Sequence, residues 1–66
     1  MNTEARRSGV CACLLDGMSD RAIALVMGIE HRTARDDVRA LRKRFEAESK
    51  GDLARLLRAL LLAEAA

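Results

Sequence analysis

The sequence contains no proline, tryptophan or tyrosine, and its single aromatic residue is Phe45. Leucine, alanine and arginine dominate while valine and isoleucine are scarce, which favours helices over strands. Long apolar runs are also missing, since Leu56–Ala63 is interrupted by Arg58 and is too short to span a bilayer. The first residues, MNTEARR, lack the apolar core of a signal peptide. We therefore expect a soluble, cytoplasmic protein with no membrane partner.

Cysteine and histidine are too few to build a disulfide framework or a metal site. Cys11 and Cys13 lie two positions apart, so on a helix their side chains point about 160° away from each other. With His31 they make three candidate ligands, and a fourth is missing. We therefore expect small, reduced, buried thiols, and no metal or other cofactor.

Catalysis has little support in this composition. The chain has one histidine, no glycine-rich phosphate loop, and too few residues to wall a pocket. A chain of 66 residues also buries only roughly 60% of the surface that it exposes when unfolded. We expect one non-enzymatic domain, residues 1–66, whose stability is marginal unless a second subunit adds to it.

Capping and turn residues divide the chain into four predicted helices, at about 4–16, 20–27, 31–46 and 50–63. The start and stop signals are Asn2 or Thr3, Gly17, Ser19, Gly28, and the capping box from Ser49 to Asp52. Glu30 is a weaker cap for the third helix. The predicted inner faces are Val10, Cys11, Leu14 and Leu15 on the first helix, and Ile23, Ala24 and Met27 on the second. The fold class is therefore all-α, a four-helix bundle.

The third predicted helix, 31–46, has two different faces. Ala34, Val38, Leu41 and Phe45 fall within about 60° of one another at a helical period and form an apolar stripe. The opposite side is cationic. Between His31 and Arg44 there are six basic and two acidic residues, an excess of four positive charges. This uneven charge placement indicates nucleic acid as the partner.

The short helix 20–27, the turn at Gly28 and the cationic helix have the layout of a helix-turn-helix, whose second helix enters the DNA major groove. Arg35 and Arg39 are the best candidates for base contacts, followed by Arg32. The expected backbone contacts come from Thr33, Arg42, Lys43, Arg21 and His31. Asp36 lies near the centre of the exposed arc, where it reads cytosine, pairs with Arg32 or Arg39, or weakens non-specific binding. Asp37 points toward the flank, as a structural ion-pair partner.

The fourth predicted helix carries more apolar surface than one face can bury. Its leucines span roughly 160° of the circumference, and Leu62 lies outside even that arc. Part of this surface would close the core. The rest would be exposed to water in a single chain, so we expect it to be buried in a two-fold homodimer. The dimerisation residues would be Ala54, Leu57, Arg58, Leu61 and Leu62. The alternative is that this helix simply wraps the small core of one chain.

From Arg6 to about Leu62 the chain resembles, without gaps, the LuxR/GerE-type helix-turn-helix domain. The matching positions are Val10-Cys11, Gly17-Met18-Ser19, Ile23-Ala24, Met27-Gly28-Ile29, Thr33-Ala34-Arg35, Leu41, Phe45, Ser49 and Asp52-Leu53. The resemblance implies a stand-alone transcriptional regulator that binds double-stranded DNA as a homodimer through its fourth helix. It also implies that Thr33 touches a phosphate and Arg35 a base. The chain departs from the family pattern at Arg7, Leu25, Val26, Glu30, Asp36 and Asp37.

A second hypothesis assigns the same fold to protein binding. Leu25 and Val26 on the second helix, together with the leucine-rich fourth helix, would dock on a protein regulator or another transcription protein without touching DNA. The two aspartates on the cationic helix keep this alternative open, because carboxylates that face DNA repel its phosphates.

Overall fold

Four helices joined by connections of three to five residues make up the computed structural model, which describes residues 2–65. They are α1 (Thr3–Leu15), α2 (Asp20–Met27), α3 (His31–Arg44) and α4 (Lys50–Ala65). The predicted all-helical fold is confirmed, and each predicted helix end lies within two residues of the observed one. No helix within residues 2–65 has the length and apolar character needed to cross a membrane.

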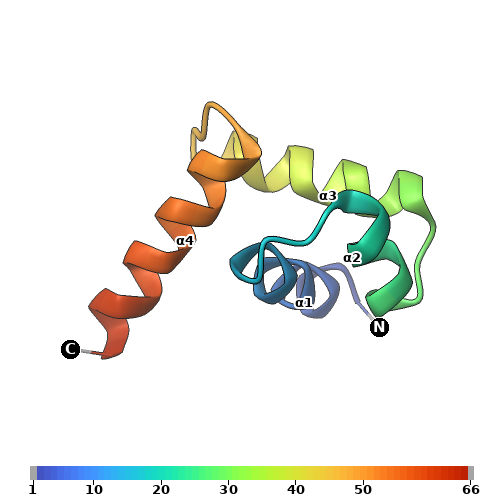
Figure 1. The fold of residues 1–66 in the computed structure, drawn as a ribbon, viewed down its shortest axis with the longest axis horizontal. Coiled ribbons are helices and arrows are strands. Elements are labelled where there is room, and N and C mark those ends of the chain that lie inside the picture. The colour runs from blue at the N-terminus through green and yellow to red at the C-terminus, as the bar shows by residue number, and fades with distance from the viewer. Residues whose placement is uncertain (1, 66) are drawn as a thin grey trace.

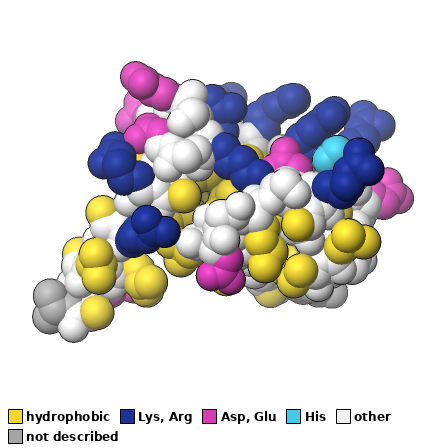
Figure 2. All heavy atoms as spheres, viewed as in Figure 1, with side chains coloured by type: hydrophobic (Ala, Val, Ile, Leu, Met, Phe, Trp, Pro, Cys, Tyr) yellow, Lys and Arg dark blue, Asp and Glu magenta, His cyan; other side chains and the backbone are white. Residues whose placement is uncertain are grey.

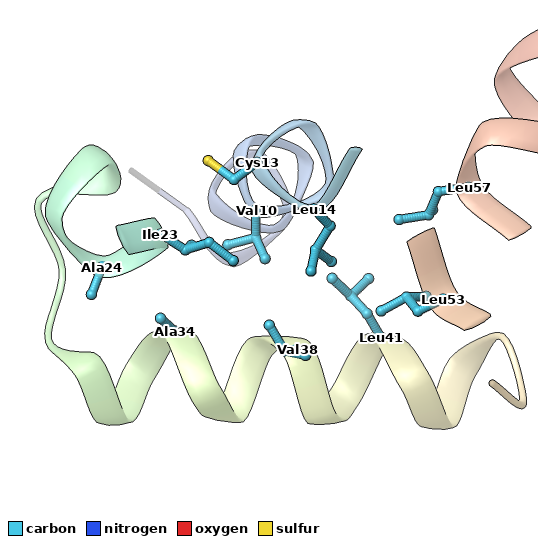
Figure 3. Packing of buried hydrophobic residues seen from close by; sticks show 10 residues of the cluster. All are labelled: Val10, Cys13, Leu14, Ile23, Ala24, Ala34, Val38, Leu41, Leu53 and Leu57. Carbon is cyan, nitrogen blue, oxygen red and sulfur yellow. The ribbon is translucent and has the colours of Figure 1, made fainter. Parts of the chain in front are cut away.

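The helices pack around one small core (Figure 1). α1 lies over the middle of α3, α2 packs near the N-terminal end of α3, and α4 packs near its C-terminal end (Figure 3). Side chains from all four helices meet between them. The buried apolar residues are Val10, Cys13, Leu14, Ile23, Ala24, Ala34, Val38, Leu41, Leu53 and Leu57. Because α3 touches the other three helices, its orientation is set along its whole length.

The inner face of α1 differs from the prediction at Cys11, Cys13 and Leu15. Cys13 is 5% exposed and belongs to the core, whereas Cys11 and Leu15 are only half-buried. α1 is covered by α2 on one side and by α4 on another, so its buried arc is centred on Val10, Cys13 and Leu14. On α2, Ile23 and Ala24 are buried as predicted.

Three of the helix starts have the expected side-chain caps. Asn2 Oδ1 accepts a hydrogen bond from the Ala5 amide at 2.7 Å, and Ser19 Oγ accepts one from the Ala22 amide at 3.1 Å. Ser49 Oγ accepts from the Asp52 amide at 3.0 Å, while Asp52 Oδ2 accepts from the Glu48 amide. The Ser49 cap is thus confirmed, while the return bond of the predicted capping box comes from the amide before Ser49. The start of α3 has no side-chain cap, because Glu30 makes no such bond.

The first three helices all end with a residue in the left-handed region. Gly17 (φ 74°) and Gly28 (φ 66°) adopt this conformation without steric cost. After α3 the same position is occupied by Glu46 (φ 53°), and the Ala47 amide donates to the Arg42 carbonyl at 2.8 Å. This is the Schellman geometry that glycine normally serves. Glu46 is therefore a strained residue at the end of the cationic helix.

Substituting Glu46→Gly is expected to stabilise the protein, because glycine removes the clash between Cβ and the backbone in this conformation. The expected gain is about 0.5–1 kcal/mol after the greater entropy loss of glycine is subtracted. For a chain of this size that corresponds to a rise in Tm of roughly 2–8 °C. Thermal unfolding followed by circular dichroism measures it, with Glu48→Gly as the matched control. An unchanged or lower Tm for Glu46→Gly would show that the turn is not strained.

Candidate nucleic-acid interface

α3 divides into a buried face and a cationic face, as predicted. Ala34, Val38 and Leu41 are at most 5% exposed, and the half-buried Phe45 packs against the same core. On the opposite side, Lys and Arg side chains gather along the edge of the molecule that α3 forms, at the top of Figure 2. We call this surface the cationic face. Its exposed basic residues are Arg32, Arg35, Arg39 and Lys43.

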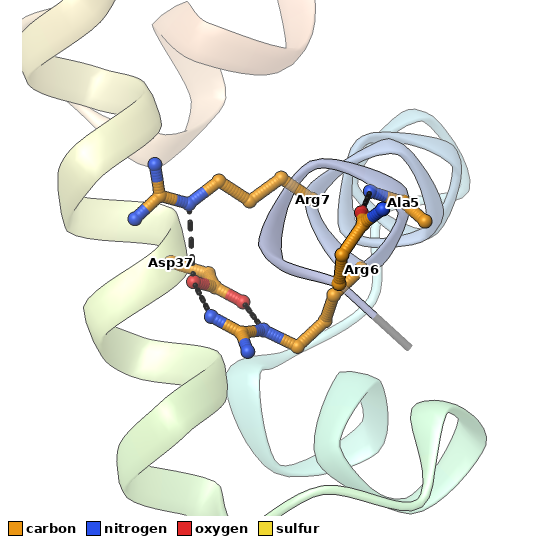
Figure 4. Close-up of polar contacts among 5 residues, drawn as sticks. Ala5, Arg6, Arg7 and Asp37 are labelled. Atoms are coloured by element: carbon orange, nitrogen blue, oxygen red, sulfur yellow. Dashed lines mark hydrogen bonds and ion pairs between the residues drawn. The ribbon is translucent and has the colours of Figure 1, made fainter.

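A buried ion pair fixes the position of α3 against α1 (Figure 4). Asp37 is 1% exposed, so it lies in the interior and not at the flank where the sequence placed it. Arg6 donates to both of its oxygens, through Nε at 2.6 Å and Nη2 at 2.9 Å, and Arg7 Nε donates to Oδ1 at 3.2 Å. The prediction that Asp37 is a structural ion-pair partner is confirmed. Its partners come from α1, about thirty residues earlier.

These contacts shift the ionisation of both partners. The hydrogen bonds from Arg6 hold the pKa of the Asp37 carboxyl below its ordinary value of 3.8, and burial opposes this only in part. The hydrogen bond to Asp37 correspondingly raises the pKa of Arg6. At neutral pH the cluster is therefore fully charged. It carries one more positive than negative charge, next to the cationic face.

The lowered pKa of Asp37 predicts a loss of stability in acid. Unfolded Asp37 binds a proton more readily than folded Asp37, so this pair stabilises the fold above about pH 4 and stops doing so as the pH falls further. Asp52 acts in the same direction, since the Glu48 amide and then Arg55 lower its pKa. Tm should be steady near neutral pH and fall as the pH drops below about 4. A carbon-13 NMR titration should place the Asp37 midpoint below 3.8, and a midpoint above that value would contradict the assignment.

Most of the predicted DNA-contacting residues lie at the surface. Arg21 and His31 are exposed near the start of α2 and of α3, and Thr33 is half-buried. Within residues 2–65, no exposed basic residue of the cationic face forms an ion pair. The guanidinium and ammonium groups of this face are therefore available to an external anion.

Arg42 is the exception among the predicted backbone contacts. It is half-buried, its Nη2 donates to the Glu48 carbonyl, and its Nε is enclosed without a partner. The side chain is thus turned toward the connection between α3 and α4, where it stabilises the chain reversal. Arg42 is a structural residue in this conformation, because the turn that follows α3, with Glu46 in the left-handed region, brings the Glu48 carbonyl within reach.

Arg44 occupies a position that the helical pattern did not single out. It is exposed at the end of α3 and, with Arg7, Thr3 and Ser8, lines an open depression between α1 and α3. Arg44 counts among the basic residues of the third helix in the sequence. The depression could not be predicted, because it depends on how α1 crosses α3. Glu4 lines the same depression and Arg7 already pairs with Asp37, so Arg44 is the cation there that an external group could reach.

The predicted dimerisation residues on α4 have different environments. Leu57 is 8% exposed and belongs to the core of its own chain, and Ala54 is half-buried. Arg58 is exposed, and its Nη2 donates to the Leu15 carbonyl at 3.2 Å, across the end of α1. Leu61 (53%) and Leu62 (65%) are exposed, as is Leu60 (48%). Because α4 leaves the core after Leu57, only its C-terminal leucines remain uncovered.

Neither cysteine belongs to a possible metal site in the described part of the chain. Both cysteines are free, and no group of three or more His, Cys, Asp and Glu side chains in residues 2–65 is arranged to hold a metal ion. Burial raises the pKa of the Cys11 thiol, and nearby Arg44 opposes this shift only in part.

Comparison of the chain with protein-family models, with curated proteins and with solved structures found no match. The assignment of function therefore depends on the residues of this chain and on their geometry.

Proposed function

We propose that this protein is a DNA-binding transcriptional regulator that inserts α3 into the major groove as a homodimer. The observation that carries the proposal is the contrast between the two faces of α3. One face is held by core residues and by the buried Asp37, while the other presents Arg32, Arg35 and Arg39 without intramolecular ion pairs. A cationic helix held rigidly at the surface is what recognition of a duplex requires.

Arginine is suited to both parts of this task. Its guanidinium binds phosphate strongly, and it can donate two hydrogen bonds to the O6 and N7 atoms of guanine in the major groove. In helix-turn-helix proteins the N-terminal residues of the second helix reach the bases. Arg32 and Arg35 occupy that half of α3, and Arg39 lies one helical turn beyond Arg35 on the same exposed face; we assign base contacts to all three. Lys43 and Arg21 then bind the phosphates on either side.

The exposed leucines at the end of α4 support a two-fold dimer. They continue a shallow groove between α1 and α4, which is lined by Ser8, Cys11, Leu15, Leu57, Leu60, Leu61 and Glu64. Burying this surface against a second α4 would add stability that a core of this size lacks. Two copies related by a two-fold axis would present two α3 helices to successive turns of one face of a duplex.

Selection from a pool of randomised duplexes tests this proposal. We expect the purified protein to enrich a palindromic sequence whose half-sites are centred about 10–10.5 base pairs apart, or a multiple of that spacing. Sedimentation equilibrium should give two chains per particle at the concentration used. A pool that shows no enrichment after repeated rounds, with a folded protein, would contradict the proposal.

One observation favours a second function, the docking of another protein. Leu25 is 80% exposed and Val26 is 61% exposed, so both lie on the outer side of α2. Large apolar side chains that are this exposed often mark an interaction surface. If docking is the main function, Leu25→Asp should abolish activity in the cell while Arg35→Ala and Arg39→Ala leave it unchanged. DNA binding predicts the opposite pattern.

A further inference from the structure

The two adjacent aspartates of α3 have opposite environments. Asp37 is buried and accepts three hydrogen bonds from α1. Asp36 is exposed, about 100° further round the helix, and lies among the basic residues of the cationic face. Only one of the two carboxylates is therefore needed to hold the fold.

The exposed carboxylate has no partner within the helix. Arg32 lies four residues before Asp36 and Arg39 lies three residues after it, so both are at a spacing that permits an ion pair. Within residues 2–65, however, neither arginine is within ion-pair distance of Asp36. An arginine that precedes the acid by four residues also has the less favourable orientation relative to the helix dipole. Intrahelical pairing thus does not explain this aspartate.

A free carboxylate in this position weakens any binding that depends on phosphates alone. It adds one negative charge to the surface that would meet the duplex, and it can accept hydrogen bonds but cannot donate them. The major groove offers donors to an acceptor only at the exocyclic amino groups of the bases. Aspartate and glutamate accept characteristically from N4 of cytosine.

We propose that Asp36 is a specificity-determining residue, which accepts a hydrogen bond from cytosine N4 in the major groove. This inference rests on the proposed function and names the base that the same site selects. Asp36 is the sixth residue of α3, between Arg32 and Arg39, in the half of the helix that reaches the bases. The flanking arginines favour guanine, so each half-site should contain a cytosine next to guanines.

The test compares three proteins on one panel of duplexes. The panel is the palindrome that the wild type selects, with each half-site position changed in turn to the other three bases. Wild type should lose about tenfold in affinity when one particular cytosine is replaced. Asp36→Ala should bind all four bases at that position within about twofold of one another. Asp36→Asn should shift the preference there to adenine, because an amide both accepts from N6 and donates to N7.

A matched control separates base recognition from net charge. Asp16 is exposed just after the end of α1, so Asp16→Asn removes one negative charge away from the cationic face. It should leave every base preference unchanged. The inference is overturned if Asp36→Ala keeps the wild-type preferences and binds every duplex more tightly, which would make Asp36 a purely repulsive charge. In that case the proposed function stands. If wild-type protein binds no duplex at all, the proposed function fails and this inference fails with it.

Discussion

Asp37→Ala is expected to destabilise the protein more than any other single substitution on α3. Removing this carboxylate leaves two arginines of α1 facing the interior without a partner, and breaking a buried ion pair in this way is strongly destabilising. The Arg6 side chain keeps 24% of its exposure and the Arg7 side chain 39%, so water can solvate part of the released charge. We therefore expect the lower end of the usual range, about 3 kcal/mol.

That loss is large for a domain of this size. A core built from fewer than about 80 residues rarely supplies more than roughly 3–5 kcal/mol. Asp37→Ala should therefore lower Tm by about 12 °C or more, or leave much of the protein unfolded at 25 °C. Urea unfolding followed by circular dichroism measures the difference.

Asp36→Ala is the matched control, because it removes the same group one residue earlier on the same helix. Asp36 is exposed and unpaired, so its removal should change the free energy of unfolding by no more than about 0.5 kcal/mol. The double variant Arg6→Ala/Asp37→Ala should be more stable than the sum of the single losses implies, since Arg7 is then the one member of the cluster left without its partner. Equal stability of Asp36→Ala and Asp37→Ala would contradict the role given to the buried pair.

Arg35→Ala combined with Arg39→Ala is expected to reduce affinity for the selected duplex by at least about 100-fold. Each arginine that donates two hydrogen bonds to a guanine contributes roughly 1–3 kcal/mol of discrimination, and both side chains also attract phosphate. Because both are exposed and neither forms an ion pair within residues 2–65, the double variant should melt within a few degrees of wild type. Fluorescence anisotropy with a labelled duplex gives the affinities.

Arg55→Ala provides the control for charge. Arg55 lies on α4 with a 70% exposed side chain and pairs with Asp52 at 2.7 Å, away from the cationic face. Its loss should reduce affinity by less than about threefold through long-range electrostatics alone. If Arg55→Ala weakens binding as much as the α3 double variant does, net charge and not the cationic face determines the affinity.

The helices and most of the core could be predicted because their signals are local. Ser19 and Ser49 are caps within three residues of the amides they satisfy, and Gly17 and Gly28 stand where a left-handed residue must follow a helix. The period of Ala34, Val38 and Leu41 likewise predicts which side of α3 is buried.

What could not be predicted depends on contacts between distant residues. The sequence indicated an ion pair for Asp37 but not its partners, because Arg6 and Arg7 reach it only after α1 has crossed α3. Arg42 looked like a phosphate contact from its helical position. Its bond to the Glu48 carbonyl depends on the turn at Glu46. The left-handed conformation of that residue could not be predicted, because the position is not a glycine. The helical pattern assigned Leu57 to the dimer interface, but the packing of α4 on α1 buries it within its own chain.

The measurement that tests DNA recognition by α3 most directly is the affinity of the protein for a duplex as a function of salt. DNA from immediately upstream of its own coding sequence and an unrelated duplex of equal length would be titrated side by side. We predict tighter binding to the upstream DNA than to the unrelated duplex. The slope of log K against log salt should be about −4 or steeper, since each phosphate contact contributes about −0.9. Affinity that does not change with salt, or no binding to any duplex at low salt by a folded dimer, would contradict the central claim.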